Sequence, residues 1–249
     1  MGDAVLQAAA AATALAGTCA AILGSNLRAA VLHGSLTLGD FASGRSDIDL
    51  LLITGPGGLS QEERGRIVHA VSTAETGAAR AIDLLAVTST TAGAPSRTPA
   101  TELQVSRYPD EMHVEEAQAD EDVAVELSMA RATGRSLIGA PVEQVIGAVP
   151  AQWVKDRGMF WLRRWLTLAD DAEHAELMVL TACRIWHVDV EGTYCSKPQA
   201  GEWAFARDPS LTAITQAIRQ RHGDANAIIP ADDVTHVLRT ILDAVGTRT

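Results

Sequence analysis

The chain has 249 residues, enough for one large domain or two ordinary ones, and its 47% hydrophobic and 20% charged residues are typical of a globular protein. The formal net charge of −11 argues against a nucleic-acid partner, because binding to a phosphate backbone needs clustered lysine and arginine. An acidic surface attracts cations instead, although the same acidity also serves solubility alone.

The first 24 residues are apolar and rich in alanine. They lack a basic start and include Asp3, Gln7 and Thr13, which favours a globular first helix over a targeting segment. We expect no membrane-spanning segment. The three cysteines are widely spaced and show no metal-ligand pattern, which predicts reduced thiols in a cytoplasmic protein.

The following stretch alternates apolar runs with glycine-bearing turns. Ser60 followed by Glu63 is a capping box that starts a helix. We therefore predict strands at 28–33, 47–53, 81–87 and 102–108, a helix at 60–76 and a loop at 88–101.

After about residue 116 the pattern becomes helical. We predict a helix at 121–135, a loop at 136–150 and five helices at 150–169, 173–191, 197–207, 210–222 and 230–246. The expected fold class is α+β, with a small mixed sheet and helices in residues 1–115 and an all-α bundle in residues 116–249.

The most informative segment is VLHGSLTLGDFASGRSDIDLLLI, residues 31–53. Gly34-Ser35 follows a predicted strand, and eleven residues after Ser35, Ser46 precedes Asp47 and Asp49 at the start of another. Residues two apart in a strand share a face, so the two carboxylates should lie side by side. Such a pair favours a bound Mg²⁺ that also takes phosphate oxygens, although a surface pair is the alternative. The Gly-Ser turn offers backbone N–H groups and a hydroxyl to those phosphates.

Asp83 is a third acid, placed within the apolar strand 81–87. Attack on a phosphate needs the attacking oxygen deprotonated, and a carboxylate beside the metal pair can accept that proton. A strand-edge acid facing solvent is the alternative interpretation.

The segment from Gly34-Ser35 to SDIDLLL is similar to the signature of the polymerase-β-like nucleotidyltransferase superfamily. The later segments TELQVSRY, LIGAP, RIW and SKPQAGEW follow in the order found in aminoglycoside (3'')(9)-adenylyltransferases, the streptomycin and spectinomycin resistance enzymes. The resemblance extends from about residue 28 to 222.

This resemblance implies that Gly34, Ser35 and Ser46 contact the phosphates of ATP, and that Lys197 reaches the triphosphate from the second domain. It also implies roles for the three acids. Asp47 and Asp49 would hold Mg²⁺, and Asp83 would act as the catalytic base beside the metal, among its ligands.

For the acceptor, the resemblance implies contacts from Tyr108, Trp165, Asp170 and His174. A cationic aminocyclitol needs a carboxylate for its charged groups and a flat aromatic face for its rings. Three positions depart from the family pattern: Asp83 replaces Glu, His174 replaces Asp, and Tyr108 replaces Trp. For Trp165 taken alone, a place in the core is the alternative.

We expect a monomeric, Mg²⁺-dependent adenylyltransferase that moves AMP from ATP to a hydroxyl of an aminoglycoside or aminocyclitol antibiotic. A second hypothesis keeps the chemistry but changes the acceptor to a protein hydroxyl, as in nucleotidyltransferase toxins, or to another small molecule. A third is a ligand-binding protein without catalysis, which the presence of Asp47, Asp49 and Asp83 together disfavours, because binding alone needs no third acid.

Overall fold

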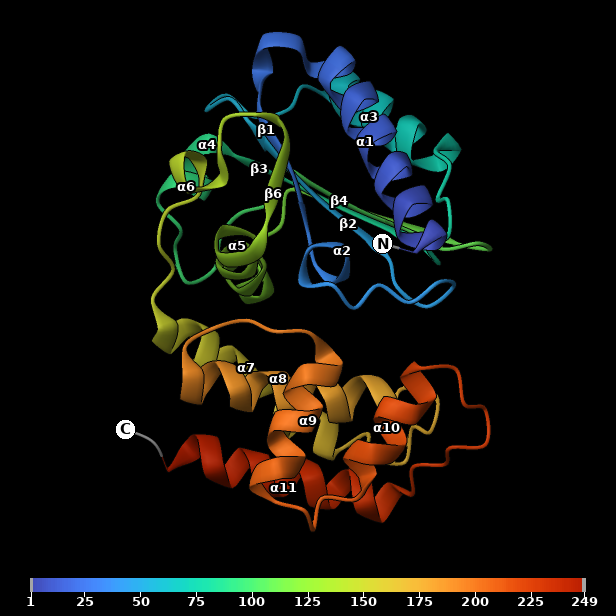
Figure 1. Cartoon of the computed structure of the whole chain (residues 1–249). Coiled ribbons are helices and arrows are strands. Elements are labelled where there is room, and N and C mark those ends of the chain that lie inside the picture. The colour runs from blue at the N-terminus through green and yellow to red at the C-terminus, as the bar shows by residue number, and fades with distance from the viewer. Residues whose placement is uncertain (1, 248–249) are drawn as a thin grey trace. The chain divides into compact units, whose positions relative to one another are not determined.

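The computed structural model of the chain describes residues 2–247 and divides into two compact units (Figure 1). The first unit ends at Val149 and the second begins at Pro150. A mixed sheet with flanking helices forms the first unit, and helices form the described part of the second. These features confirm the predicted α+β class.

Six strands build the sheet of the first unit, in the order β5–β4–β3–β2–β1–β6. Their bounds are β1 (Leu27–His33), β2 (Ile48–Thr54), β3 (Ile82–Thr88), β4 (Leu103–Arg107), β5 (Met112–Glu116) and β6 (Arg135–Gly139). Strands β2 and β3 run parallel, and the other neighbouring pairs are antiparallel. The four strands predicted from the sequence are thus confirmed as β1 to β4.

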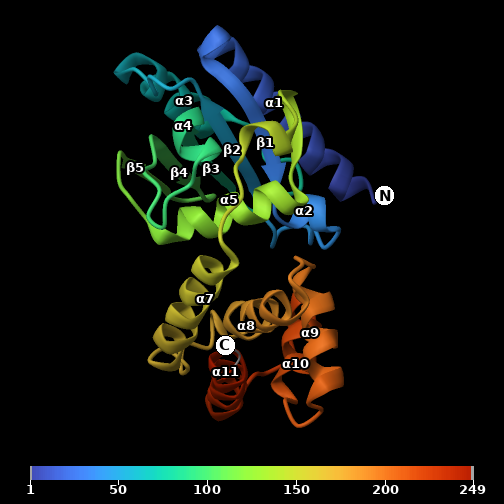
Figure 2. The same ribbon diagram turned by 90° about the vertical axis from the view of Figure 1, so that its left-hand side faces the viewer.

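Helices cover both faces of this sheet (Figures 1 and 2). They are α1 (Asp3–Leu23), the short 3-10 turn η1 (Gly24–Asn26), α2 (Ser35–Leu38), α3 (Gln61–Thr73), α4 (Ser89–Gly93), α5 (Glu121–Thr133) and α6 (Val142–Val145). Helices α1 and α3 pack on one face against residues such as Leu50 and Leu84. Helix α5 packs on the other face against Val31 and Leu51. The apolar run of β2 is buried on both sides for this reason.

Residues 3–26, which include helix α1, are long and apolar enough to cross a membrane by length and composition alone, a test that core helices of soluble proteins also pass. One face of the helix belongs to the core beside the sheet. Its buried residues are Ala8, Ala11, Ala12, Leu15, Ala16, Cys19 and Leu23. Small alanine side chains allow the helix to lie close to the strands, so α1 acts as a core helix of the first unit.

The second unit contains the five helices that the sequence predicts. They are α7 (Ala151–Leu166), α8 (Ala175–Glu191), α9 (Lys197–Arg207), α10 (Ala213–Arg221) and α11 (Ala231–Gly246). Helix α8 contacts the other four and supplies Leu180 and Cys183 to the core of the unit. Gly192 ends α8 in a left-handed conformation, which glycine adopts without strain.

The predicted domain boundary between residues 115 and 116 is wrong. The compact units separate at Val149 and Pro150, because the intervening segment belongs to the first unit. Strand β6 pairs with β1, and α5 packs on the sheet through Val123 and Leu127. The sequence pattern of α5 is helical like that of the later helices, so it gave no sign that α5 packs on the sheet.

Four further local elements, β5, β6, α4 and α6, were also missed by the sequence analysis. The predicted loop 136–150 contains most of β6 and all of α6, and the predicted loop 88–101 contains α4. Strand β5 is exposed at all five positions, so it lacks the apolar pattern that identifies a strand. Pairing with a strand distant in the sequence, rather than a local pattern, determines β6.

We predict that Leu127→Ala destabilises the first unit selectively, because the fully buried Leu127 side chain joins α5 to the sheet. The expected cost is about 2–5 kcal/mol. Amide hydrogen exchange followed by mass spectrometry should show faster exchange in β1, β2 and β3, with α8 to α11 unchanged. Leu177→Ala is the control, because Leu177 is exposed. Faster exchange throughout both units would contradict the assignment of α5.

Candidate active site

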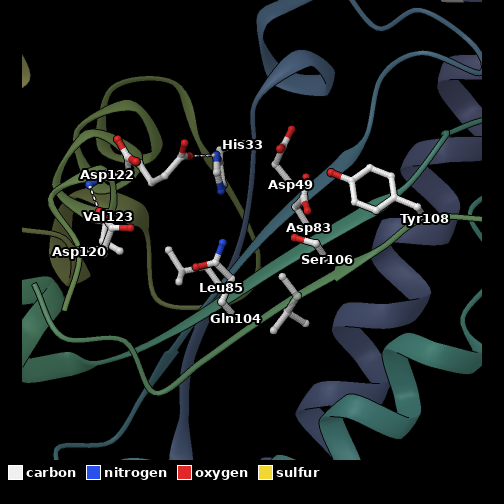
Figure 3. A pocket seen from close by; sticks show the side chains of 12 residues that line it. His33, Asp49, Asp83, Leu85, Gln104, Ser106, Tyr108, Asp120, Asp122 and Val123 are labelled. Carbon is white, nitrogen blue, oxygen red and sulfur yellow. Dashed lines mark hydrogen bonds and ion pairs between the residues drawn. The ribbon is translucent and has the colours of Figure 1, made fainter. Parts of the chain in front are cut away.

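A row of polar side chains crosses four neighbouring strands at one level of the sheet (Figure 3). His33 of β1 pairs with Asp49 of β2, which pairs with Asp83 of β3, which in turn pairs with Ser106 of β4. Directly paired residues of neighbouring strands project from the same face. The fold therefore places Asp49 and Asp83 side by side, although they are far apart in the sequence.

The apolar part of the same face explains why this row stays in place. Two residues away on each strand, Val31 and Leu51 belong to the core cluster beneath α5, and the partly buried Leu85 packs against it. Because side chains alternate between the faces of a strand, the packing of these three fixes the direction of His33, Asp49 and Asp83.

The polar row lines a cavity of about 300 Å³ within the first unit. Gln104 and Tyr108 line it from β4 and from the residue following β4. Asp120, Asp122 and Glu126 line it from α5 and its N-terminal cap. Five of the twelve lining residues are acidic, which favours a cationic or metal-associated ligand.

Gly34 and Ser35 form the turn beside Asp49. Gly34 has φ +70° and ψ −147°, a conformation that essentially only glycine adopts. A Cβ atom at this position would overlap the Asp49 carboxylate. The Ser35 hydroxyl is buried and has no hydrogen-bond partner among the described residues. A buried hydroxyl of this kind is suited to a ligand oxygen.

Ser46 has a different local role. Its side chain is buried, and its hydroxyl oxygen accepts a 3.0 Å hydrogen bond from the Ala42 backbone N–H. This contact closes the loop that leads into β2. Ser46 therefore positions the loop before Asp47, and its predicted phosphate contact stays a prediction.

Burial raises the pKa of the Asp83 carboxyl above its usual range. A hydrogen bond with Ser106 lowers this pKa, the negative charge of Asp47 raises it, and the positive charge of Arg80 lowers it. The net effect makes Asp83 a better proton acceptor than an exposed aspartate. In Figure 3 the Tyr108 ring turns its hydroxyl toward Asp83.

Asp47 is held by an arginine that the sequence analysis did not single out. Arg80 Nε donates to Asp47 Oδ1 and Arg80 Nη2 to Asp47 Oδ2, both at 3.1 Å. The same guanidinium lies over the Tyr108 ring, 5.3 Å from its centroid. Its position just before the strand of Asp83 was the available signal, since Asp47 similarly precedes β2.

His33 is buried and neutral at physiological pH, because burial lowers its pKa to about 4. Its Nδ1 atom lies 3.5 Å from Glu126 Oε2, without a hydrogen bond. The low pKa means that this contact is not an ion pair near neutral pH. His33 therefore lines the cavity as an uncharged side chain.

Among residues 2–247, no three His, Cys, Asp or Glu side chains are grouped so that they could hold a metal ion. The predicted set of Asp47, Asp49 and Asp83 is thus not a ready-made cage. Magnesium is commonly bound by one or two carboxylates together with phosphate oxygens. The adjacent Asp49 and Asp83 fit this mode, because their hard oxygen donors share one face of the sheet.

The other predicted residues lie in the second unit. Trp165 packs partly against the helical core and stacks on Trp161, with ring centroids 5.7 Å apart. Asp170 is exposed in the turn after α7. His174 precedes α8, and its Nδ1 lies 2.8 Å from Asp171 Oδ2.

Lys197 begins α9, directly after Ser196, which caps this helix. The Ser196 side chain and Gln199 form a capping box that fixes the start of α9. The backbone at Lys197 is therefore well defined, whereas its predicted contact with ATP stays a prediction.

Comparison with known proteins gives a family match for most of the second unit. Residues 144–243 match the family model described as "Aminoglycoside adenylyltransferase, C-terminal domain". The matched residues cover most of the helical unit. The resemblance inferred from the sequence is therefore confirmed for that unit.

Curated relatives carry the same description. Aminoglycoside (3'') (9) adenylyltransferases from Rhizobium radiobacter and Klebsiella pneumoniae are 32% and 33% identical over 96 residues. The matched segment is 39% of this chain and 36% and 37% of those proteins, so it spans little more than a third of their length.

The fold of the adenylyltransferases extends to the first unit as well. A solved structure of spectinomycin adenyltransferase AAD(9) from Enterococcus faecialis, with ATP and spectinomycin, matches with a TM-score of 0.74. The match covers 93% of this chain and 96% of that one at 15% identity. At this identity the match shows a shared fold.

We predict that Gly34→Ala lowers both stability and the binding of an ATP analogue, because the added methyl group collides with the Asp49 carboxylate. Gly39→Ala is the matched control. Gly39 also has a positive φ, but no atom lies within 4 Å of the place that an added methyl group would take. Gly39→Ala carries only the strain of a left-handed alanine, about 1–2 kcal/mol. Gly34→Ala should lose about 1–3 kcal/mol more, because its φ/ψ lies outside the left-handed region and its methyl group collides with Asp49. Equal losses in urea unfolding would contradict the close approach of Gly34 to Asp49.

Proposed function

We propose that the protein is a magnesium-dependent adenylyltransferase that transfers AMP from ATP to a hydroxyl of an aminoglycoside or aminocyclitol antibiotic. The observation that carries this proposal is the pairing of Asp49 with Asp83 beside the Gly34-Ser35 turn. Two supports come from the comparisons. Most of the helical unit matches the model of an aminoglycoside adenylyltransferase domain family, and the matching AAD(9) structure was solved with ATP and spectinomycin.

In this proposal, Asp83 acts as the general base. It accepts the proton of the acceptor hydroxyl while the oxygen forms a bond to the α-phosphorus of ATP. The bond from the α-phosphorus to the oxygen bridging to the β-phosphate breaks, and pyrophosphate leaves. The raised pKa of Asp83 suits it to this proton transfer, and the neighbouring sheet residues hold its carboxyl in place.

The phosphates of ATP would be held by backbone N–H groups and polar side chains. The Gly34-Ser35 turn offers backbone N–H groups and the buried Ser35 hydroxyl to the phosphates, while Ser46 and Lys197 supply further contacts. Asp47 and Asp49, with Asp83 beside them, would hold Mg²⁺. When bound, the ion offsets the negative charge of the triphosphate.

The acceptor would be recognised by aromatic and acidic side chains. Tyr108 offers a ring next to Asp83, and Trp165 offers a second aromatic surface from the helical unit. Asp170 and the exposed pair of Asp171 with His174 provide polar groups for ammonium or guanidinium substituents. Streptomycin and spectinomycin are the acceptors that we propose, with the reaction placed in the cytoplasm.

We predict that incubation with ATP and magnesium yields pyrophosphate and an antibiotic whose mass has increased by one AMP group. Streptomycin and spectinomycin should be supplied separately, with EDTA as the control that abolishes the reaction. Mass spectrometry of the product identifies the acceptor. An absence of adenylylated drug in both reactions would overturn the acceptor, and labelling of a protein hydroxyl would favour the toxin-like alternative.

Asp83→Asn should bind ATP but lose turnover by about 10²–10⁴-fold, the usual contribution of a general base. The same variant should be more stable than the parent at pH 7. The raised pKa of Asp83 means that its ionised form is disfavoured in the folded state, and asparagine removes this penalty. The difference in stability should disappear below about pH 4, where Asp83 is protonated in the folded and unfolded states.

Pyrophosphate release and thermal unfolding at several pH values test both parts of this prediction. Normal turnover would exclude Asp83 as the base. Loss of ATP binding would instead identify Asp83 chiefly as a metal ligand.

We predict that Asp47→Asn and Asp49→Asn each abolish turnover, because each removes a charged oxygen donor from the proposed magnesium site. Asp243→Asn is a control for the loss of one carboxylate, since Asp243 is an exposed residue of α11 in the second unit. Near-normal pyrophosphate release from either of the first two variants would refute the metal assignment.

A further inference from the structure

The Arg80 side chain connects three of the residues assigned to the proposed site. It donates two hydrogen bonds of 3.1 Å to Asp47, and its guanidinium lies over the Tyr108 ring. Its positive charge also acts on Asp83. These contacts are made by the guanidinium and not by the backbone of the sheet, so they depend on the side chain itself.

The backbone of Arg80 is fixed while its side chain is accessible. The Arg80 N–H donates a 2.9 Å hydrogen bond to the Ser46 carbonyl oxygen, which ties it to the start of β2. The side chain beyond this anchor is 47% exposed, whereas that of Asp47 is 20% exposed. An ion pair with one half-exposed partner is only weakly stabilising, so the guanidinium can leave Asp47 at small cost.

We propose that Arg80 is an internal counter-ion that competes with the divalent cation for Asp47. This inference rests on the proposed function, because it takes Asp47 as a metal ligand. With no metal bound, Arg80 neutralises Asp47 and reduces its repulsion of Asp83. For a divalent ion to use Asp47 fully, the fork between Arg80 and both carboxylate oxygens has to open.

This competition explains why the three acids do not form a ready-made metal cage. Asp47 has both oxygens directed to Arg80, so Asp49 and Asp83 remain as the adjacent pair. A cation placed at the site without phosphates meets a positive charge already in position. A metal that arrives with triphosphate brings negative charge, which gives the displaced guanidinium a new partner.

Mn²⁺ binding to the full chain without nucleotide tests this inference, followed by the electron paramagnetic resonance signal of free Mn²⁺. Arg80→Gln should bind Mn²⁺ about 5-fold more tightly or better, because a competing cation has been removed. In EDTA it should melt at a lower temperature than the parent, and Mg²⁺ should raise its Tm by more. Arg219→Gln is the matched control, since Arg219 also donates two hydrogen bonds to an aspartate, Asp224, and is 55% exposed.

A second variant separates competition for Asp47 from a general change in charge. In an Asp47→Asn background, Arg80→Gln should leave Mn²⁺ affinity unchanged within about 2-fold, because the carboxylate for which the two cations compete is gone. Arg80→Lys should fall between the parent and Arg80→Gln, since lysine keeps the charge without the two-pronged contact.

Weaker or unchanged Mn²⁺ binding in Arg80→Gln would overturn the inference, and weaker binding would show that Arg80 orients Asp47 for the metal. Tighter binding that persists in the Asp47→Asn background would overturn it as well. Failure of the proposed function is a separate result. Tighter Mn²⁺ binding by Arg80→Gln, with no adenylylated product from the parent protein, supports the role of Arg80 and rejects the reaction. Normal product from the parent, with the same Mn²⁺ affinity in Arg80→Gln, supports the reaction and rejects the role of Arg80.

Discussion

The candidate site depends on the parallel register of β2 and β3. That register places Asp49 opposite Asp83 at one end of a face whose other part is apolar. Two neighbouring carboxylates repel each other when both are ionised. Burial also disfavours the ionised form of Asp83, and it is the main cause of the raised pKa of this carboxyl. Such an arrangement persists only when the surrounding fold imposes it. Here the apolar residues on both faces of β2 and β3 supply that constraint.

The rest of the first unit can be understood from this constraint. Helices α1 and α3 bury one face of the sheet, and α5 buries the far part of the other, so the strands cannot shift in register without exposing leucines. At the level of Asp49 this apolar cover gives way to a cavity lined by carboxylates. The turn at Gly34 then approaches so closely that only glycine fits beside Asp49. Stability and site geometry therefore come from the same packing.

Many of the strands and helices could be predicted from the sequence, because local residue patterns identify them. The runs around Asp49 and Asp83 identified two buried strands with acids at their start, and Ser60 with Glu63 marked a helix that the structure confirms. The pairing of β2 with β3 was not predictable in this way, because it joins residues that local periodicity cannot relate. Strand β6 was missed for the same reason, because it pairs with β1 from the other end of the first unit. Without β6, the domain boundary was predicted too early in the chain.

Arg80 shows a second limit of sequence patterns. Asp47 and Asp49, two positions apart, were predicted to act as equal neighbours on one strand. The structure gives them different surroundings: Asp47 precedes β2 and is held by Arg80, whereas Asp49 lies within β2 opposite Asp83. The pairing of this arginine with an aspartate 33 residues away cannot be seen in any local sequence pattern, although it decides how much negative charge the cluster presents to a cation. In a chain with formal charge −11, a strong attraction for cations is available everywhere on the surface. A local positive charge at Asp47 is then a means of making the site selective for a cation that brings its own anion, which is the form in which magnesium accompanies a triphosphate.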